Sequence, residues 1–145
     1  MSLKDTASFE LQSYKDLYAK AQYDFARLDE LVNSYDLFNF LAAINHLHEW
    51  VVKETGKKCP TVSGDTLDII RRLCNRAKHF DHAKNSPSTE VREGYSMGRF
   101  GKGPYGVGEP SYVVTKDDGT VIHVLDLCKD ALAIWDSFLK AEGLL

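Results

Sequence analysis

This chain of 145 residues contains few cysteines and no long apolar segment. Its three cysteines, at positions 59, 74 and 128, are odd in number and scattered, which argues against a disulfide framework or a cysteine-rich zinc module. No apolar run approaches the roughly 20 residues of a membrane-spanning helix. No charged and then apolar leader opens the chain. We therefore expect a cytoplasmic protein with no membrane partner.

The overall proportions of apolar and charged residues are typical of a globular protein. Apolar residues make up 43% of the chain and charged residues 27%, close to the usual proportions. A chain of this length can bury about 68–70% of the surface that it exposes when unfolded. We therefore predict a single domain over residues 1–145.

Spacings of three and four between apolar residues predict a pair of long helices in the first part of the chain. The first is expected over about Ser8–Val32 and the second over about Tyr35–Glu54. Asn33 and Ser34 supply a stop and a new N-cap between them. A connection this short makes the two helices antiparallel neighbours.

Two further helices are expected later in the chain. Ser63 or Asp65 can cap a third helix that runs to about Phe80 or Ala83. A last helix is expected to follow a cap at Asp126 and to stop at Gly143.

Between these two helices the composition changes. Residues 84–110 hold six of the ten glycines and three of the four prolines, which predicts a long flexible loop. Residues 111–124 contain Asp118-Gly119 between two β-branched runs, a pattern that predicts a β-hairpin. The fold expected is all-α: an up-and-down four-helix bundle with a long Gly-rich loop and one β-hairpin inserted before the last helix.

Charge is unevenly distributed along the sequence. The formal net charge is −3, yet the stretch from Arg71 to Lys102 holds eight basic and three acidic residues. That stretch is therefore +5 and the rest of the chain −8. A basic region on an acidic body can steer a phosphate-rich partner to one face. A solvated helix face followed by a loop would produce the same pattern.

The third helix carries the candidate catalytic residues. At 100° per residue, one arc opposite its apolar stripe (Ile70, Leu73, Cys74 and Ala77) holds Asp68, Arg72, Asn75, Arg76 and His79. Guanidinium groups match phosphate oxygens, and histidine exchanges protons near neutral pH. Such a set could cleave RNA without a metal, the imidazole moving a proton at the 2′-hydroxyl or the leaving oxygen. The alternative is an ordinary solvated polar face.

Two antiparallel helices followed by a helix with Arg72, six intervening residues and His79 resemble the HEPN superfamily. The resemblance implies a helical-bundle endoribonuclease or RNA-binding protein, with many members acting as toxins or in phage defence. It also implies a metal-independent site without a cofactor, shared across a homodimer, in which Arg72 and His79 form the catalytic pair and Asn75, Arg76 and Asp68 support it. The sequence departs from the family pattern by placing Leu73 directly after the arginine.

Helix geometry points independently to a dimer. Arg72 and His79 are separated by about 10.5 Å along a helix axis, at about 1.5 Å per residue. The arginine side chain also leans toward the helix N-terminus, away from His79. A two-fold arrangement of antiparallel helices would bring Arg72 of one protomer near His79 of the other. In a monomer Arg76 would be the better partner of His79.

The Gly-rich loop offers a second candidate RNA contact. Arg99 and Lys102 could bind phosphates while aromatic side chains such as Tyr105 stack on bases. The alternative is a surface connection whose aromatic residues pin it to the bundle.

Two other functions stay open. Metal ligands could come from the second helix (His46, His48 and Glu49) and from the end of the third (His79, Asp81 and His82), although the apolar stripe favours His48 as a buried, hydrogen-bonded core histidine. A non-catalytic helical interaction or regulatory module, with an antitoxin-like protein partner, would use the basic face and the loop as a protein surface.

Overall fold

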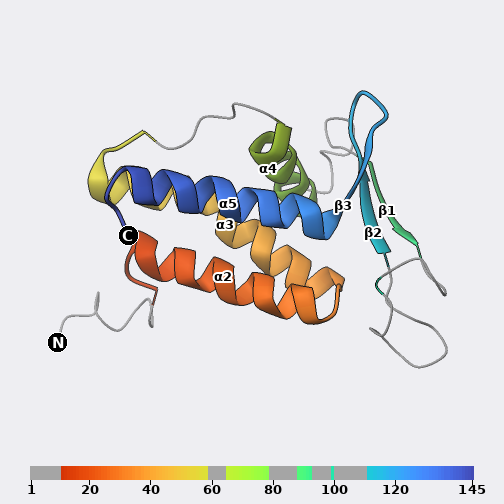
Figure 1. Cartoon of the computed structure of the whole chain (residues 1–145), viewed down its shortest axis with the longest axis horizontal. Helices are drawn as coiled ribbons and strands as arrows, with labels where there is room; N and C mark the ends of the chain where they lie inside the picture. Colours follow the sequence, from red (N-terminus) through yellow and green to blue (C-terminus); the bar gives the residue numbers. More distant parts are fainter. Residues whose placement is uncertain (1–10, 59–64, 79–87, 93–98, 100–110) are drawn as a thin grey trace.

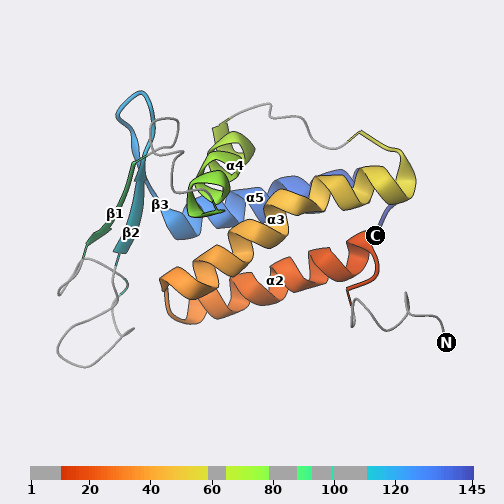
Figure 2. The same ribbon diagram turned by 180° about the vertical axis from the view of Figure 1, so that it is seen from behind.

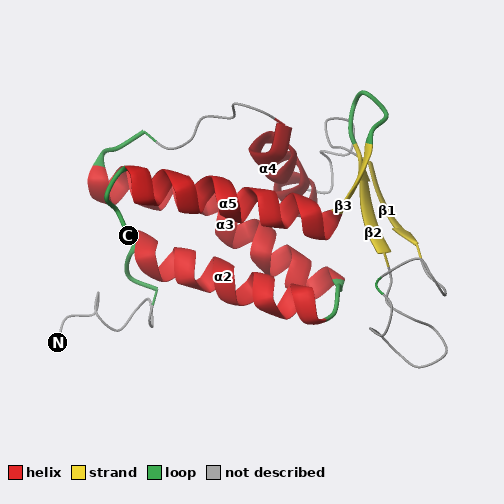
Figure 3. Ribbon diagram, viewed as in Figure 1, coloured by secondary structure: helices red, strands yellow, loops and turns green. Residues whose placement is uncertain are grey.

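The computed structural model describes residues 11–58, 65–78, 88–92, 99 and 111–145. Within these residues the protein is mostly helical, with four helices and one small antiparallel sheet. Figure 3 shows that the helices form the bulk of the molecule and that the strands gather at one end. The up-and-down arrangement expected for all four helices is not confirmed, because α4 (Asp65–Lys78) is steeply inclined to α5 (Val124–Ala141) in Figure 1 and Figure 2.

The first described helix, α2 (Tyr14–Glu30), begins later than predicted. Residues 11–13 are not helical, so a continuous helix from Ser8 is wrong. Ser13 accepts a hydrogen bond from the Asp16 amide, and the Asp16 side chain accepts from the Ser13 amide. This reciprocal capping box satisfies two amides that would otherwise lack partners, and it fixes the start of the helix.

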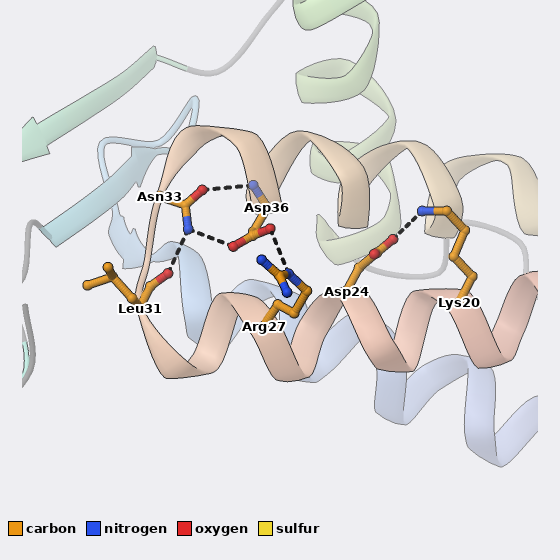
Figure 4. Close-up of polar contacts among 6 residues, drawn as sticks. All are labelled: Lys20, Asp24, Arg27, Leu31, Asn33 and Asp36. Atoms are coloured by element: carbon orange, nitrogen blue, oxygen red, sulfur yellow. Dashed lines mark hydrogen bonds and ion pairs between the residues drawn. The ribbon is translucent and has the colours of Figure 1, made fainter.

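The predicted antiparallel pair is confirmed: α3 (Ser34–Thr55) folds back along α2. Figure 4 shows the corner between them, where the Asn33 side chain accepts from the Asp36 amide at 2.9 Å. The same side chain donates to the Leu31 carbonyl at 2.9 Å and to the Asp36 carboxylate at 2.7 Å. Arg27 pairs with Asp36 across the corner at 3.4 Å. Asn33 is therefore the N-cap of α3, one residue before the expected cap Ser34, and the helix begins at Ser34 rather than at Tyr35.

A single apolar core joins the helices and the sheet. Its most deeply buried members come from every described helix and from the middle strand: Leu28, Phe40, Ile44, Leu47, Ile70, Cys74, Val114, Val124 and Leu139. Trp135 is buried and Trp50 packs against the same core, so both tryptophans contribute to packing.

The sheet contains one more strand than predicted. Strands β2 (Ser111–Thr115) and β3 (Val121–His123) form the expected hairpin, with Val114 opposite Ile122. Strand β1 (Ser88–Arg92) pairs antiparallel on the other side of β2, and the strand order is β1-β2-β3. Residues 84–110 are therefore not a loop throughout. Glycine and proline dominate the composition of that segment and hide the short alternation of β-branched residues within it.

The last helix also starts earlier than predicted. Strand β3 runs directly into α5, whose N-cap residue is His123 and has no side-chain cap. Val124 and Leu125 are buried, so their packing extends the helix toward the strand. Asp126 lies in the first turn, where its charge suits the positive end of the helix, and its expected role as the cap is wrong.

Candidate functional site

Helix α4 has the two faces that its sequence predicts. Ile70, Leu73 and Cys74 are buried, as is Ile69 beside them. Asp68, Arg72 and Asn75 are partly exposed. The predicted stripe is confirmed for its three described members, while the side chain of Ala77 lies outside the described part of the structure.

Arg72 makes a two-pronged contact with the turn between β2 and β3. Its Nη1 donates to one carboxylate oxygen of Asp117 at 3.0 Å, and its Nη2 donates to the other at 3.2 Å. The Asp68 carboxylate lies 3.8 Å from the same Nη1 and also pairs with Arg71 at 2.7 Å. Arg72 is therefore held between its own helix and the hairpin.

The ion pair shifts both partners toward their charged forms. Hydrogen bonding to Asp117 raises the pKa of Arg72. Hydrogen bonding to Arg72 lowers the pKa of the Asp117 carboxyl. The Asp117 side chain is 76% exposed, whereas that of Arg72 is 21% exposed. Solvent thus reaches this contact mainly from the aspartate side.

The structure tests only part of the predicted catalytic set. Arg72, Asp68 and Asn75 share one described helix face. The side chain of Arg76 and the whole of His79 lie outside the described residues, so the Arg72–His79 pair stays a prediction. Asp117 was not predicted. Its Asp-Asp-Gly setting marks a hairpin turn, but nothing in the sequence relates that turn to α4.

Arg99, which was predicted to bind RNA phosphates, contacts an aspartate of α2 in the structure. Its guanidinium pairs with the Asp29 carboxylate at 2.8 Å and also donates to the Asp29 carbonyl near the end of α2. A cation at this end of a helix is favoured by the helix dipole. This pairing links residue 99 to the helical body, whereas the aromatic residues that the alternative relied on lie outside the described residues. Lys102 and Tyr105 lie outside the described residues.

The histidines of α3 do not assemble a metal site with their described neighbours. The Nδ1 atom of His46 lies 3.8 Å from Oε1 of Glu49. His48 is exposed, and its Nδ1 atom is hydrogen-bonded to the carbonyl of Asn45 at 2.8 Å. The prediction of a buried His48 is wrong, because the helix turns it past the edge of the apolar stripe. Across the described ranges no group of three potential metal ligands comes together. The remaining predicted ligands, His79, Asp81 and His82, lie outside those ranges.

A patch of apolar side chains on the surface was also missed by sequence reasoning. Leu31, Tyr35 and Phe38, at the corner between α2 and α3, are 39%, 85% and 43% exposed. Tyr35 and Phe38 lie three residues apart on α3, whereas Leu31 precedes the N-cap Asn33 and is not helical. Periodicity alone could not tell that these side chains face solvent.

The two described cysteines are buried. Burial raises the pKa of the Cys128 thiol well above its usual range, and a thiol in such surroundings is a poor nucleophile. Cys74 faces the core, as predicted.

Comparison of the chain with protein-family models, curated proteins and solved structures finds no match. None of the helices in the described part of the chain has the length and apolar character needed to cross a membrane.

Proposed function

We propose that the polar face of α4 binds RNA phosphates and that the protein is a HEPN-like, metal-independent endoribonuclease or RNA-binding protein of a toxin or phage-defence system. The proposal includes the up-and-down bundle and the homodimer that this resemblance implies. It assigns the catalytic roles to Arg72 and His79, with Asp68, Asn75 and Arg76 in support.

The observation that carries this proposal is the two-pronged contact of Arg72. A carboxylate reaches both terminal nitrogens of its guanidinium at 3.0 and 3.2 Å. The guanidinium fork matches the two oxygens of a carboxylate and of a phosphate in the same manner. The end of Arg72 thus directs both terminal nitrogens at a bidentate anion, a position that the Asp117 carboxylate holds in this structure.

The proposed reaction is attack of the RNA 2′-oxygen on the adjacent phosphorus. The new bond joins the 2′-oxygen to phosphorus, and the bond from phosphorus to the 5′-oxygen breaks. The His79 imidazole takes the 2′-hydroxyl proton while water protonates the leaving oxygen, or it protonates the leaving oxygen while water takes the 2′-hydroxyl proton. Arg72 stabilises the charge that grows on the phosphate oxygens. In a two-fold dimer the two residues come from different protomers.

The experiment that tests this function is digestion of bulk RNA by purified protein in the presence of EDTA. We expect cleavage by the wild type and its loss in His79→Ala and Arg72→Ala. Arg71→Ala is the matched control, because Arg71 precedes Arg72 on α4 and also pairs with Asp68. Equal loss in the two arginine variants, or intact RNA with the wild type, would contradict the proposed role of Arg72 in cleavage.

A second candidate function is a non-catalytic protein-interaction module, which the exposed patch of Leu31, Tyr35 and Phe38 favours. Under this alternative the wild type leaves RNA intact. Replacing Tyr35 and Phe38 by serine would then disrupt a purified complex with a protein partner. Val52→Ser is the control, because Val52 is 46% exposed on the same helix.

A further inference from the structure

The turn between β2 and β3 holds Asp117 in a defined position. The Lys116 amide donates to the Thr120 carbonyl at 2.8 Å, and the Gly119 amide donates to the Lys116 carbonyl at 3.0 Å. Asp118 accepts from the Thr120 amide at 2.9 Å. Gly119 has a φ of 87°, a conformation that glycine adopts without strain. The Asp117 carboxylate is therefore presented to Arg72 by an ordered turn rather than by a loose tail.

The Asp117 carboxylate takes the position on Arg72 that a phosphate would need. Both carboxylate oxygens face the terminal nitrogens of the guanidinium, and a bidentate phosphate uses the same two donors. Two anions cannot occupy these donors together. An RNA phosphate can therefore reach the end of Arg72 only when Asp117 leaves.

The contact is placed where such an exchange is feasible. Asp117 is 76% exposed, and an ion pair at an exposed surface contributes little stability. Asp68 belongs to α4 and lies beside the same guanidinium at 3.8 Å. It would still orient Arg72 after the turn has moved away, so the arginine does not lose all its support when Asp117 is displaced.

We propose that Asp117 is an autoinhibitory stand-in for an RNA phosphate, and that the β2–β3 turn releases Arg72 when RNA binds. This inference rests on the proposed function of the α4 face. It adds a device that lowers the affinity of the site for RNA and couples occupation of the site to movement of the hairpin.

The test measures binding of a short, mixed-sequence 2′-O-methyl RNA in EDTA, because this probe keeps the phosphates and cannot be cleaved through its 2′-oxygen. We expect Asp117→Asn to bind it about 1.5- to fivefold more tightly than the wild type, the range set by breaking an exposed ion pair. The charge change alone would also favour RNA binding, so a control with the same charge change is needed.

Asp118→Asn supplies that control. It removes one negative charge from the same turn and retains the Oδ1 atom that accepts from Thr120. We expect a clearly smaller gain in affinity for this variant. We also expect the gain from Asp117→Asn to disappear in an Arg72→Ala background.

The other outcomes separate the two proposals. If the wild type binds RNA through Arg72 but the two asparagine variants gain equally, autoinhibition by Asp117 is wrong and the RNA site stands. A gain that persists without Arg72 also overturns the inference. If no variant binds the probe, both the RNA site and its inhibition are overturned.

A measurement on the unmodified protein gives an independent readout. We expect addition of the RNA probe to shift the NMR amide signals of residues 116–120 in the wild type, because the turn loses its contact with α4. In Asp117→Asn the same signals should already lie near their RNA-bound positions. Turn signals that do not change while RNA binds would contradict release of the hairpin.

Discussion

At the corner between α2 and α3, Arg27 and Asp36 pair across nine residues of sequence, whereas at the sheet end Arg72 and Asp117 pair across 45. In the first region the aspartate also bonds Asn33, the cap of the helix in which it lies. In the second region the aspartate lies on the β2–β3 turn and bonds a residue of a different element, α4. The corner contacts thus help to define a helix start, while the sheet-end contact joins two elements that are distant in the sequence.

The helical body and the hairpin contact also differ in how deeply their side chains are buried. Phe25 and Phe40 join α2 to α3 with ring centroids 5.9 Å apart, and Phe40 is fully buried. Asp117, in contrast, is mostly exposed. The comparison therefore predicts large effects of substitution on stability in the helical body and small ones at the hairpin contact.

The largest effect is expected for Phe40→Ala. Removing a fully buried aromatic ring should lower the free energy of unfolding by about 3–5 kcal/mol. Urea denaturation measures this loss. Tyr35→Ala, an aromatic change on the same helix at an 85% exposed position, should stay within about 0.5 kcal/mol of the wild type. Similar losses in both variants would contradict the packing described for α3.

A smaller effect is expected at the cap of α3. Asn33→Ala should lower the free energy of unfolding by about 0.5–2 kcal/mol, because the Asp36 amide loses its acceptor. Asn33→Ser retains an acceptor oxygen without adding a negative charge beside the Asp36 carboxylate, and it serves as the control. A loss as large in Asn33→Ser as in Asn33→Ala would show that capping is not what Asn33 contributes.

The contact between α2 and α5 gives a pH-dependent prediction. Burial, together with the hydrogen bond to Asp136 at 3.0 Å, raises the pKa of Tyr18 to about 12. Because an unfolded tyrosine ionises near pH 10, the unfolded state loses this proton first. The contribution of Tyr18 to stability is therefore complete below pH 10 and is lost as the pH rises through 12.

Chemical denaturation at a series of alkaline pH values checks this sign. The wild type should become less stable from pH 10 upward more steeply than Tyr18→Phe, which has no phenolic proton to lose. Lysine titration affects both proteins alike, so the difference between them isolates Tyr18. Parallel pH profiles would contradict the raised pKa.

The smallest effect on stability is expected at the hairpin contact. Asp117→Asn should shift the thermal midpoint by less than about 2 °C, because the ion pair is exposed and screened by solvent. Circular dichroism measures this midpoint. A shift as large as that of the cap variant would mean that the turn supports the fold, and it would argue against easy release of Arg72.

Much of the helical body could be predicted from the sequence. Asn33 between two periodic stretches marked the corner, and Gly143, with a φ of 69°, marked the region where α5 ends. These signals are local, since a cap or a turn bonds atoms only a few residues away. The starts of two helices were nevertheless misplaced. α2 begins at Tyr14, after the cap Ser13, and α5 begins at Val124, before the expected cap Asp126.

The candidate site was predictable only in part. Arg72 could be assigned to the polar face of α4 from spacing alone. Its partner could not, because the pairing with Asp117 depends on how the hairpin packs against α4. The exposure of Tyr35 was not predictable for a similar reason: an apolar side chain is buried only if another element covers it.

The sequence by itself determined the antiparallel helix pair, the two faces of α4 and the hairpin around Asp118-Gly119, because each follows from backbone preferences and periodicity within a short stretch. Only the tertiary structure decided that β1 completes the sheet, that Arg99 binds Asp29, and that a hairpin carboxylate holds Arg72. Those contacts join residues that are distant along the chain, and packing of the whole molecule sets which of them meet.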